Sequence, residues 1–138
     1  MSKIYVLEDH MPLRRFVAAN LLARGFDVVE AFSAELMLPL LQQGTPDLLV
    51  LDLSLPGMSG LQLLNQLQQE GLTTFPVMVV SAWADGQMEA IRASFPQVVE
   101  VITKPISVAE LIRCIYQILP PETPRSGIAF MRTNEDEE

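Results

Sequence analysis

The chain has 138 residues, of which 49% are hydrophobic, and it carries 17 acidic against 9 basic side chains. This length predicts one compact domain with a buried core. The net charge of −8 argues against binding to nucleic acids or anionic membranes, because both depend on Lys and Arg. The single cysteine, Cys114, excludes an internal disulfide and a zinc site built from cysteines.

The two ends of the chain show no targeting or membrane-spanning segment, and the C-terminal end is acidic. Glu8 and Asp9 come too early for a signal peptide, and no apolar run approaches the ~20 residues of a membrane span. We therefore expect a cytoplasmic protein. Residues 121–138 contain two prolines and end in four consecutive acidic residues, which predicts a flexible acidic tail after a domain at 1–120.

Five short apolar runs predict β-strands. Each is flanked by turn residues, and two of them lack the alternation of a half-exposed strand, as is typical of parallel strands covered on both faces. The predicted strands are Lys3–Leu7, Phe26–Glu30, Leu48–Leu51, Val77–Val80 and Val98–Ile102.

Longer amphipathic segments alternate with these strands and predict five helices. They are Met11–Arg24, a helix that follows Ser33 and ends before Gly44, Leu61–Gln69, Asp85–Ser94 and Val108–Leu119. Ser33 and Ser107 suit helix N-caps, and Pro39 should kink or shorten the second helix. The spacing predicts buried faces made by Leu13, Phe16, Val17 and Leu21 in the first helix and by Leu61, Leu64 and Leu67 in the third.

Strict alternation of strand and helix predicts a doubly wound α/β fold. Five parallel strands would form one sheet with helices on both faces. In such folds ligands bind beyond the carboxyl ends of the strands, at the point where the strand order reverses. The residues just after each strand are therefore the first candidates for a site.

Polar residues stand at four of these strand ends. Glu8 and Asp9 follow the first predicted strand, Asp52 the third, Ser81 the fourth and Lys104 the fifth. Three carboxylates brought together repel one another, so each favours its protonated form unless a cation intervenes. Carboxylate oxygens are suited to Mg²⁺ (or Mn²⁺), which retains waters that a phosphoryl oxygen can replace.

These groups predict phosphoryl chemistry. A carboxylate can attack phosphorus to form an aspartyl phosphate, and Asp52, followed by a Gly/Pro-rich loop, is the best nucleophile. Phosphoryl transfer depends on positioning and charge neutralisation, which Lys104 and the metal would supply. Ser81 would offer a hydroxyl hydrogen bond, while Glu8 and Asp9 would hold the metal.

Over residues 3–119 the sequence resembles the receiver domains of two-component response regulators. The resemblance rests on Glu8-Asp9, on Asp52 in Leu-Val-Leu-Asp-Leu, on the loop at 55–60, on Ser81-Ala82 and on Lys104-Pro105. It implies a flavodoxin-like (βα)5 fold, a phospho-acceptor at Asp52 and a metal site. The implied metal ligands are Glu8, Asp9, Asp52 and the backbone carbonyl of Ser54.

The resemblance also implies a function and partners. A sensor histidine kinase or phosphotransfer protein would donate the phosphoryl group, and phosphorylation would switch contacts with a downstream protein target. Direct binding of DNA or a membrane is not expected. The face at residues 85–119 is a candidate for homodimer formation. The only chemistry expected is self-phosphorylation and self-dephosphorylation, so the protein is not interpreted as an enzyme.

Two alternatives stay open. Receiver domains usually carry Tyr or Phe three residues before the lysine, where this chain has Val101, and this departure favours a pseudo-receiver that binds partners without phosphorylation. Phe95-Pro96-Gln97 also departs from the usual Gly-Ala. A phosphatase with an aspartyl nucleophile is less favoured, because the general-acid position two residues after Asp52 holds Ser54.

Three further side chains have simpler interpretations. His10 is expected to face solvent, because one histidine without other imidazole or thiol ligands is a poor metal site. Cys114 is expected to be a small core residue. Trp83 would either shield the acyl phosphate from water or cover apolar surface.

Overall fold

The computed structural model describes residues 2–82 and 88–120, within which five strands alternate with five helices. The elements in chain order are β1 (Lys3–Leu7), α1 (Met11–Ala23), β2 (Asp27–Ala31), α2 (Ala34–Gln43), β3 (Leu48–Asp52), α3 (Gly60–Gln69), β4 (Val77–Ser81), α4 (Met88–Ser94), β5 (Val98–Thr103) and α5 (Val108–Ile118). Most predicted boundaries lie within one residue of these. The predicted start of α4 at Asp85 lies outside the described residues, as do Trp83 and the predicted tail at 121–138.

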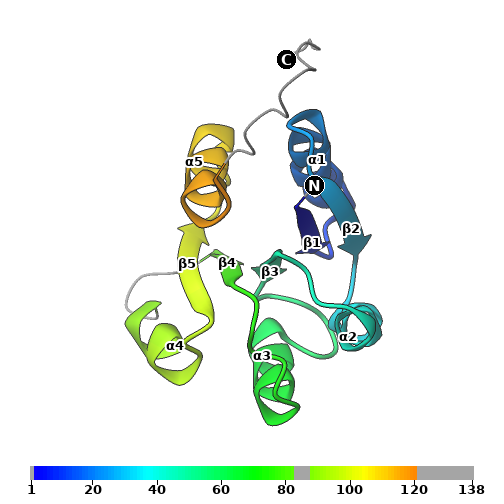
Figure 1. Cartoon of the computed structure of the whole chain (residues 1–138), viewed down its shortest axis with the longest axis vertical. Helices are drawn as coiled ribbons and strands as arrows, with labels where there is room; N and C mark the ends of the chain where they lie inside the picture. The colour runs from blue at the N-terminus through cyan, green and yellow to red at the C-terminus, as the bar shows by residue number, and fades with distance from the viewer. Residues whose placement is uncertain (1, 83–87, 121–138) are drawn as a thin grey trace, which may run out of the picture.

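The strands form one parallel sheet in the order β2-β1-β3-β4-β5. Helices α1 and α5 cover one face, and α2, α3 and α4 cover the other (Figure 1). The order reverses between β1 and β3, because β1 pairs with β2 on one side and with β3 on the other. The predicted doubly wound α/β fold is confirmed.

A separate apolar core lies on each face of the sheet. Met37, Leu64 and Ile91 belong to the cluster under α2, α3 and α4. Leu21 and Ile115 belong to the cluster under α1 and α5. All residues of β3 and β4 are buried, as their continuous apolar runs predict. No helix among the described residues is long and apolar enough to cross a membrane.

Local interactions explain several helix boundaries. Ser33 accepts a hydrogen bond from the Leu36 N–H and Ser107 accepts one from the Glu110 N–H, so both predicted N-caps are confirmed. Of the two predicted effects of Pro39, the shortening of α2 is wrong, because the helix continues to Gln43, and the kink stays a prediction. Pro39 is exposed, so water can reach the part of the helix where proline removes a backbone donor.

Two large apolar side chains do not join the core as predicted. Phe16 is 44% exposed and Leu61 is 43% exposed. In α1 the buried stripe consists of Val17, Ala18 and Leu21, and Phe16 lies beside it. The helical period of 3.6 residues is compatible with burial of either Phe16 or Ala18 beside Val17. Packing of α1 against the sheet decides which of the two is buried.

Candidate functional site

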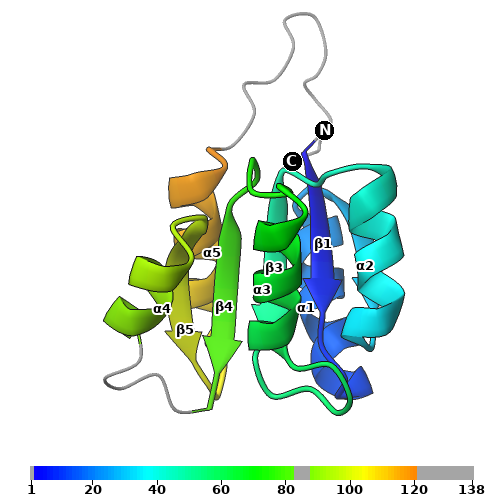
Figure 2. The same cartoon turned by 90° about the horizontal axis from the view of Figure 1, so that it is seen from below.

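The predicted site residues converge at one edge of the sheet. The strands all point the same way, so the loops that follow β1, β3, β4 and β5 meet at their carboxyl ends (Figure 2). Asp52 and Ser81 are the last residues of β3 and β4, and each is 1% exposed. Glu8 directly follows β1 and is also buried, while Lys104 directly follows β5. The predicted convergence is confirmed.

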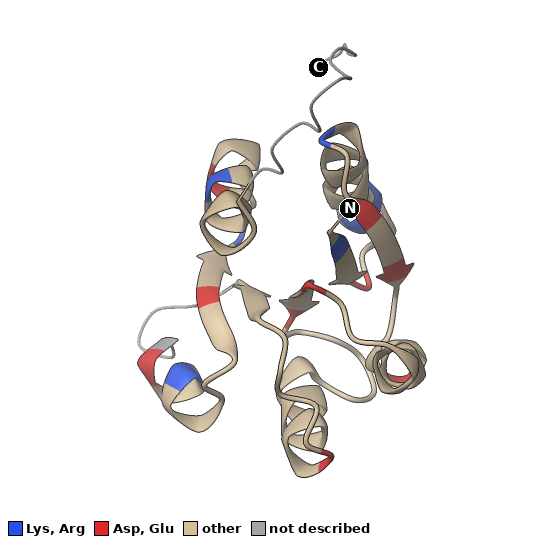
Figure 3. Cartoon of the chain, viewed as in Figure 1, with Lys and Arg blue, Asp and Glu red and all other residues tan. Residues whose placement is uncertain are grey.

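Three carboxylates lie together at this edge. One ligand oxygen from each of Glu8, Asp9 and Asp52 lies within 4.8 Å of the other two. Figure 3 shows acidic segments of the ribbon meeting where β1 and β3 end. Asp9 is exposed, whereas the other two are buried. A hard cation bound here would therefore meet oxygen ligands only and remain open to solvent on the Asp9 side, which fits the preferences of Mg²⁺.

Lys104 bridges the two buried carboxylates. Its Nζ lies 3.3 Å from Glu8 Oε1 and 3.4 Å from Asp52 Oδ2. The Lys104 backbone N–H donates to the carbonyl of Ser81 at 2.8 Å, which ties the ends of β4 and β5 together. The peptide bond before Pro105 is cis. Lys104 thus supplies the positive charge that balances this acidic edge.

The second oxygen of each buried carboxylate is held by the backbone. Glu8 Oε2 accepts the His10 N–H at 3.1 Å, and Asp52 Oδ1 accepts the Ser54 N–H at 3.0 Å. Each acid is therefore oriented by a donor two residues further along the chain and by Lys104 on its other oxygen. Hydrogen bonds to ionised acceptors are among the stronger ones in proteins, so both carboxylates are preorganised.

Burial and charge change the proton affinity of this site. Burial raises the pKa of Glu8 to about 7, and the neighbouring charge of Asp52 adds to the rise. Burial lowers the pKa of Lys104, but the negative charges of Asp52 and Glu8 outweigh it, so the pKa of Lys104 is raised overall. Burial is therefore the main cause of the raised pKa of Glu8, and repulsion between carboxylates contributes less.

Two contacts around the site were not predicted from the sequence. Glu35 on α2 accepts the Met58 N–H at 2.9 Å and thereby ties α2 to the loop between β3 and α3. Arg14 on α1 donates from its guanidinium to the backbone carbonyl of Glu8 at 3.1 Å. A signal for Arg14 exists in the sequence, because it lies three residues before Val17 and seven before Leu21 on the buried stripe.

Other side chains singled out in the sequence lie where their chemistry suggests. His10 is exposed at the start of α1. Cys114 is 2% exposed in the core under α5, and burial raises the pKa of its thiol. Val101 is buried in the core that α4 covers.

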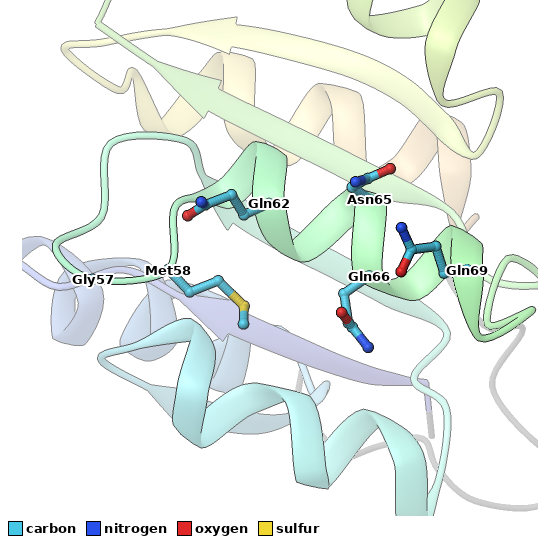
Figure 4. Close-up of a pocket in the computed structure, with 6 residues that line it drawn as sticks. All are labelled: Gly57, Met58, Gln62, Asn65, Gln66 and Gln69. Carbon is cyan, nitrogen blue, oxygen red and sulfur yellow. The ribbon is translucent and has the colours of Figure 1, made fainter.

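A polar groove of about 490 Å³ lies along α3 and the loop that precedes it. Figure 4 shows its lining side chains, which come from the loop before α3 and from the helix itself: Gly57, Met58, Gln62, Asn65, Gln66 and Gln69. None of the three clustered acids lines it. The groove therefore adds no ligand to the acidic site.

Comparison with known proteins agrees with this geometry. The family model described as "Response regulator receiver domain" matches residues 4–116. The phosphate regulon transcriptional regulatory protein PhoB of Escherichia coli (strain K12) is 33% identical over 123 residues, which cover 88% of this chain and 53% of PhoB. The chain spans about half the length of the curated relatives it matches.

Solved structures share the fold over most of the chain. The receiver domain of Francisella response regulator 1452 has a TM-score of 0.75 and 27% identity, covering 86% of this chain and 96% of that one. The chemotaxis protein CheY4 of Vibrio cholerae has a TM-score of 0.78 at 18% identity, covering 86% and 99%, and supports the fold alone. With the acidic pair, Asp52, Ser81 and Lys104 in place at four strand ends of a (βα)5 sheet, the chain belongs to the response regulator receiver family, the signalling domains of two-component systems.

Proposed function

We propose that Asp52 is the phospho-acceptor of this receiver domain and that its phosphorylation switches contacts with a protein target. The observation that carries the proposal is the buried Asp52 carboxylate, 3.4 Å from Lys104 and clustered with Glu8 and Asp9. Receiver domains pair with histidine kinases, so we propose a sensor kinase or phosphotransfer protein as the donor.

Glu8, Asp9 and Asp52 would hold a divalent cation, Mg²⁺ or Mn²⁺, with the backbone carbonyl of Ser54 as a further ligand. The donor set fits, because Glu8, Asp9 and Asp52 offer only oxygen ligands, which Mg²⁺ prefers. When bound, the cation would neutralise charge on the phosphoryl oxygens. Without a cation, Lys104 is the only positively charged side chain in the described part of the chain that pairs with the carboxylates of this cluster.

The transfer step follows from the side chains. An Asp52 carboxylate oxygen attacks phosphorus, the P–N bond of the donor phosphohistidine breaks, and its electron pair returns to the imidazole nitrogen. Lys104 pairs with Asp52 before transfer and would pair with a phosphoryl oxygen afterwards. Ser81, at the end of β4, would donate its hydroxyl to another phosphoryl oxygen.

We infer that the readout involves the ends of β4 and β5. The Lys104 N–H to Ser81 carbonyl bond joins the two residues that would engage the phosphoryl group, so their movement would be shared. The face at 85–119 would then present the change to a partner or to a second copy of the chain. Position 101 holds a buried valine and therefore no aromatic ring, so the proposed switch does not use the inward movement of a ring at this position.

Val101 also supports a second candidate, a pseudo-receiver that binds its partner without phosphorylation. A phosphatase remains less favoured, since Ser54 cannot act as a general acid at neutral pH. The proposed absence of direct DNA binding concerns this domain, whose charge to residue 120 is twelve acids against seven bases. PhoB itself is a transcriptional regulatory protein of about twice the matched length.

A two-step titration tests the proposal. We expect the fluorescence of Trp83, the single tryptophan, to respond saturably to Mg²⁺ and then to beryllofluoride, a mimic of the phosphoryl group. Asp52→Asn should lose the beryllofluoride response, whereas Asp27→Asn, which alters an exposed acid at the start of β2, should keep it. Calorimetry with the same ligands provides a second readout. A wild-type protein that binds neither ligand by either method would favour the pseudo-receiver.

A further inference from the structure

Arg14 makes two contacts that join the acidic edge to the neighbouring strand. Its Nε donates to Glu30 Oε1 at 3.1 Å, and its terminal nitrogen donates to the backbone carbonyl of Glu8 at 3.1 Å. Only 13% of the Arg14 side chain is exposed. Its own backbone N–H bonds to the His10 carbonyl at 2.9 Å, within the first turn of α1.

The Glu8 backbone is therefore held on both sides. Its N–H donates to the carbonyl of Ala31, the last residue of β2, at 3.2 Å, and its carbonyl accepts from Arg14. The Glu8 carbonyl belongs to the same rigid peptide unit as the Asp9 N–H. The position of this unit sets where the chain places the Glu8 and Asp9 side chains. A change in this one peptide plane would move two of the three clustered carboxylates relative to Asp52.

Arg14 acts here by geometry, since its positive charge is balanced by Glu30. Arg14 Nε lies 3.1 Å from Glu30 Oε1, and the Glu30 side chain is 28% exposed. A guanidinium has donors in a fixed planar fork, so it can serve a carboxylate and a carbonyl in different directions. A lysine ammonium keeps the charge but lacks this fork.

We propose that Arg14 is the positioning residue of the cation site: through the Glu8 carbonyl it holds the Glu8–Asp9 peptide so that both carboxylates reach the ion together with Asp52. This inference rests on the proposed function, because it assumes that the three acids bind a divalent cation. Partners that orient metal ligands typically contribute a factor of about 10–100 to metal affinity.

The neighbouring Arg15 provides a matched control. It has the same chemistry and lies on the same helix, but its side chain is 69% exposed and its Nε is 3.8 Å from Glu30 Oε2. Arg14→Met and Arg15→Met each remove one positive charge near an acidic site. Charge alone would make both variants bind Mg²⁺ slightly more tightly, so only the loss of positioning weakens binding.

The test measures the Kd for Mg²⁺ by calorimetry on the full chain, with circular dichroism to confirm folding. We expect the Kd of Arg14→Met to rise about tenfold, while that of Arg15→Met stays within roughly twofold of wild type because its charge is solvent-screened. Glu30→Gln should weaken binding less, and the Arg14→Met/Glu30→Gln double variant should resemble Arg14→Met. Equal affinities for Arg14→Met and Arg15→Met would overturn the proposal.

Two further arms separate positioning from a general structural defect. Labelling of Arg14→Met by acetyl phosphate should be slow at low Mg²⁺ and recover as Mg²⁺ is raised. A rate that stays low at saturating Mg²⁺ would contradict positioning. If Arg14→Met does not fold, Arg14→Lys replaces it and should still bind Mg²⁺ several-fold more weakly than wild type; equality with wild type would contradict the proposal. Absence of Mg²⁺ binding by wild type would instead refute the proposed function.

Discussion

Replacing Lys104 with methionine is expected to destabilise the metal-free protein at pH 8 by about 2–3 kcal/mol. The substitution keeps the apolar stem but removes the only side-chain cation that lies within 4 Å of the Glu8 and Asp52 carboxylates among the described residues. Removing one partner of a buried ion pair typically costs about 3–5 kcal/mol, and the 25% exposure of Lys104 reduces the expected value.

The Lys104 effect should depend on pH in a defined direction. The pKa of Glu8 is about 7 in the folded chain and 4.5 in the reference state. A raised carboxyl pKa means that the folded state is favoured most below the unfolded pKa, and that this stability is lost as pH rises through 7. At pH 5 Glu8 carries its proton, so less negative charge remains for Lys104 to balance. The destabilisation should therefore be smaller at pH 5 than at pH 8.

Urea denaturation in EDTA at the two pH values measures this difference. Arg113→Met is the control, because Arg113 is 58% exposed and lies 4.0 Å from Glu110 one helical turn away. Its substitution should change stability by less than about 0.5 kcal/mol at either pH. A Lys104→Met effect equal to this control, or one that grows as pH falls, would argue against the charge balance inferred for the site.

Replacing Gly60 with alanine is expected to destabilise the protein by about 2–3 kcal/mol. A Cβ at this position would lie 2.7 Å from the Asp52 carbonyl oxygen and 2.8 Å from the Leu53 Cα. Both are backbone atoms at the end of β3, so the start of α3 must move away from the strand. Alanine favours a helix over glycine by roughly 1 kcal/mol, which offsets only part of the clash.

Gly44→Ala is the matched control for Gly60→Ala. Nothing lies within 4 Å of a Cβ at Gly44, and its φ of −173° is accessible to any residue. This variant should be neutral or more stable by about 0.4–1 kcal/mol, because alanine restricts the unfolded chain. Since Gly60 packs directly on Asp52, its variant should also lose Mg²⁺ affinity, while Gly44→Ala should not. Similar unfolding midpoints for the two variants would show that the α3–β3 contact is not tight.

The fold was predictable from sequence because its signals are local. Continuous apolar runs at β3 and β4 indicate strands covered on both faces, and Ser33 and Ser107 mark helix starts through side-chain hydrogen bonds. The placement of Asp52, Ser81 and Lys104 at one edge then follows from parallel strands alone. No long-range contact had to be known to expect three acids and a lysine together.

What sequence could not predict depends on contacts between distant segments. Arg14 and Arg15 are chemically identical neighbours, and only packing against β2 makes one a largely buried partner of Glu30 and the other a surface residue. In α3, likewise, only packing of the helix against the rest of the fold decides that Leu64 is buried and Leu61 is exposed. The link from Glu35 to the Met58 N–H joins residues 23 positions apart and depends on the path of a loop.

The most direct test of the central claim is the intact mass of the protein after incubation with acetyl phosphate. With Mg²⁺ present, wild type should gain the mass of one phosphoryl group, and EDTA or Asp52→Asn should abolish the gain. Asp27→Asn should be labelled like wild type. Labelling that persists in Asp52→Asn would place the acceptor elsewhere, and wild type that is never labelled would contradict a phosphorylation switch at this acidic edge.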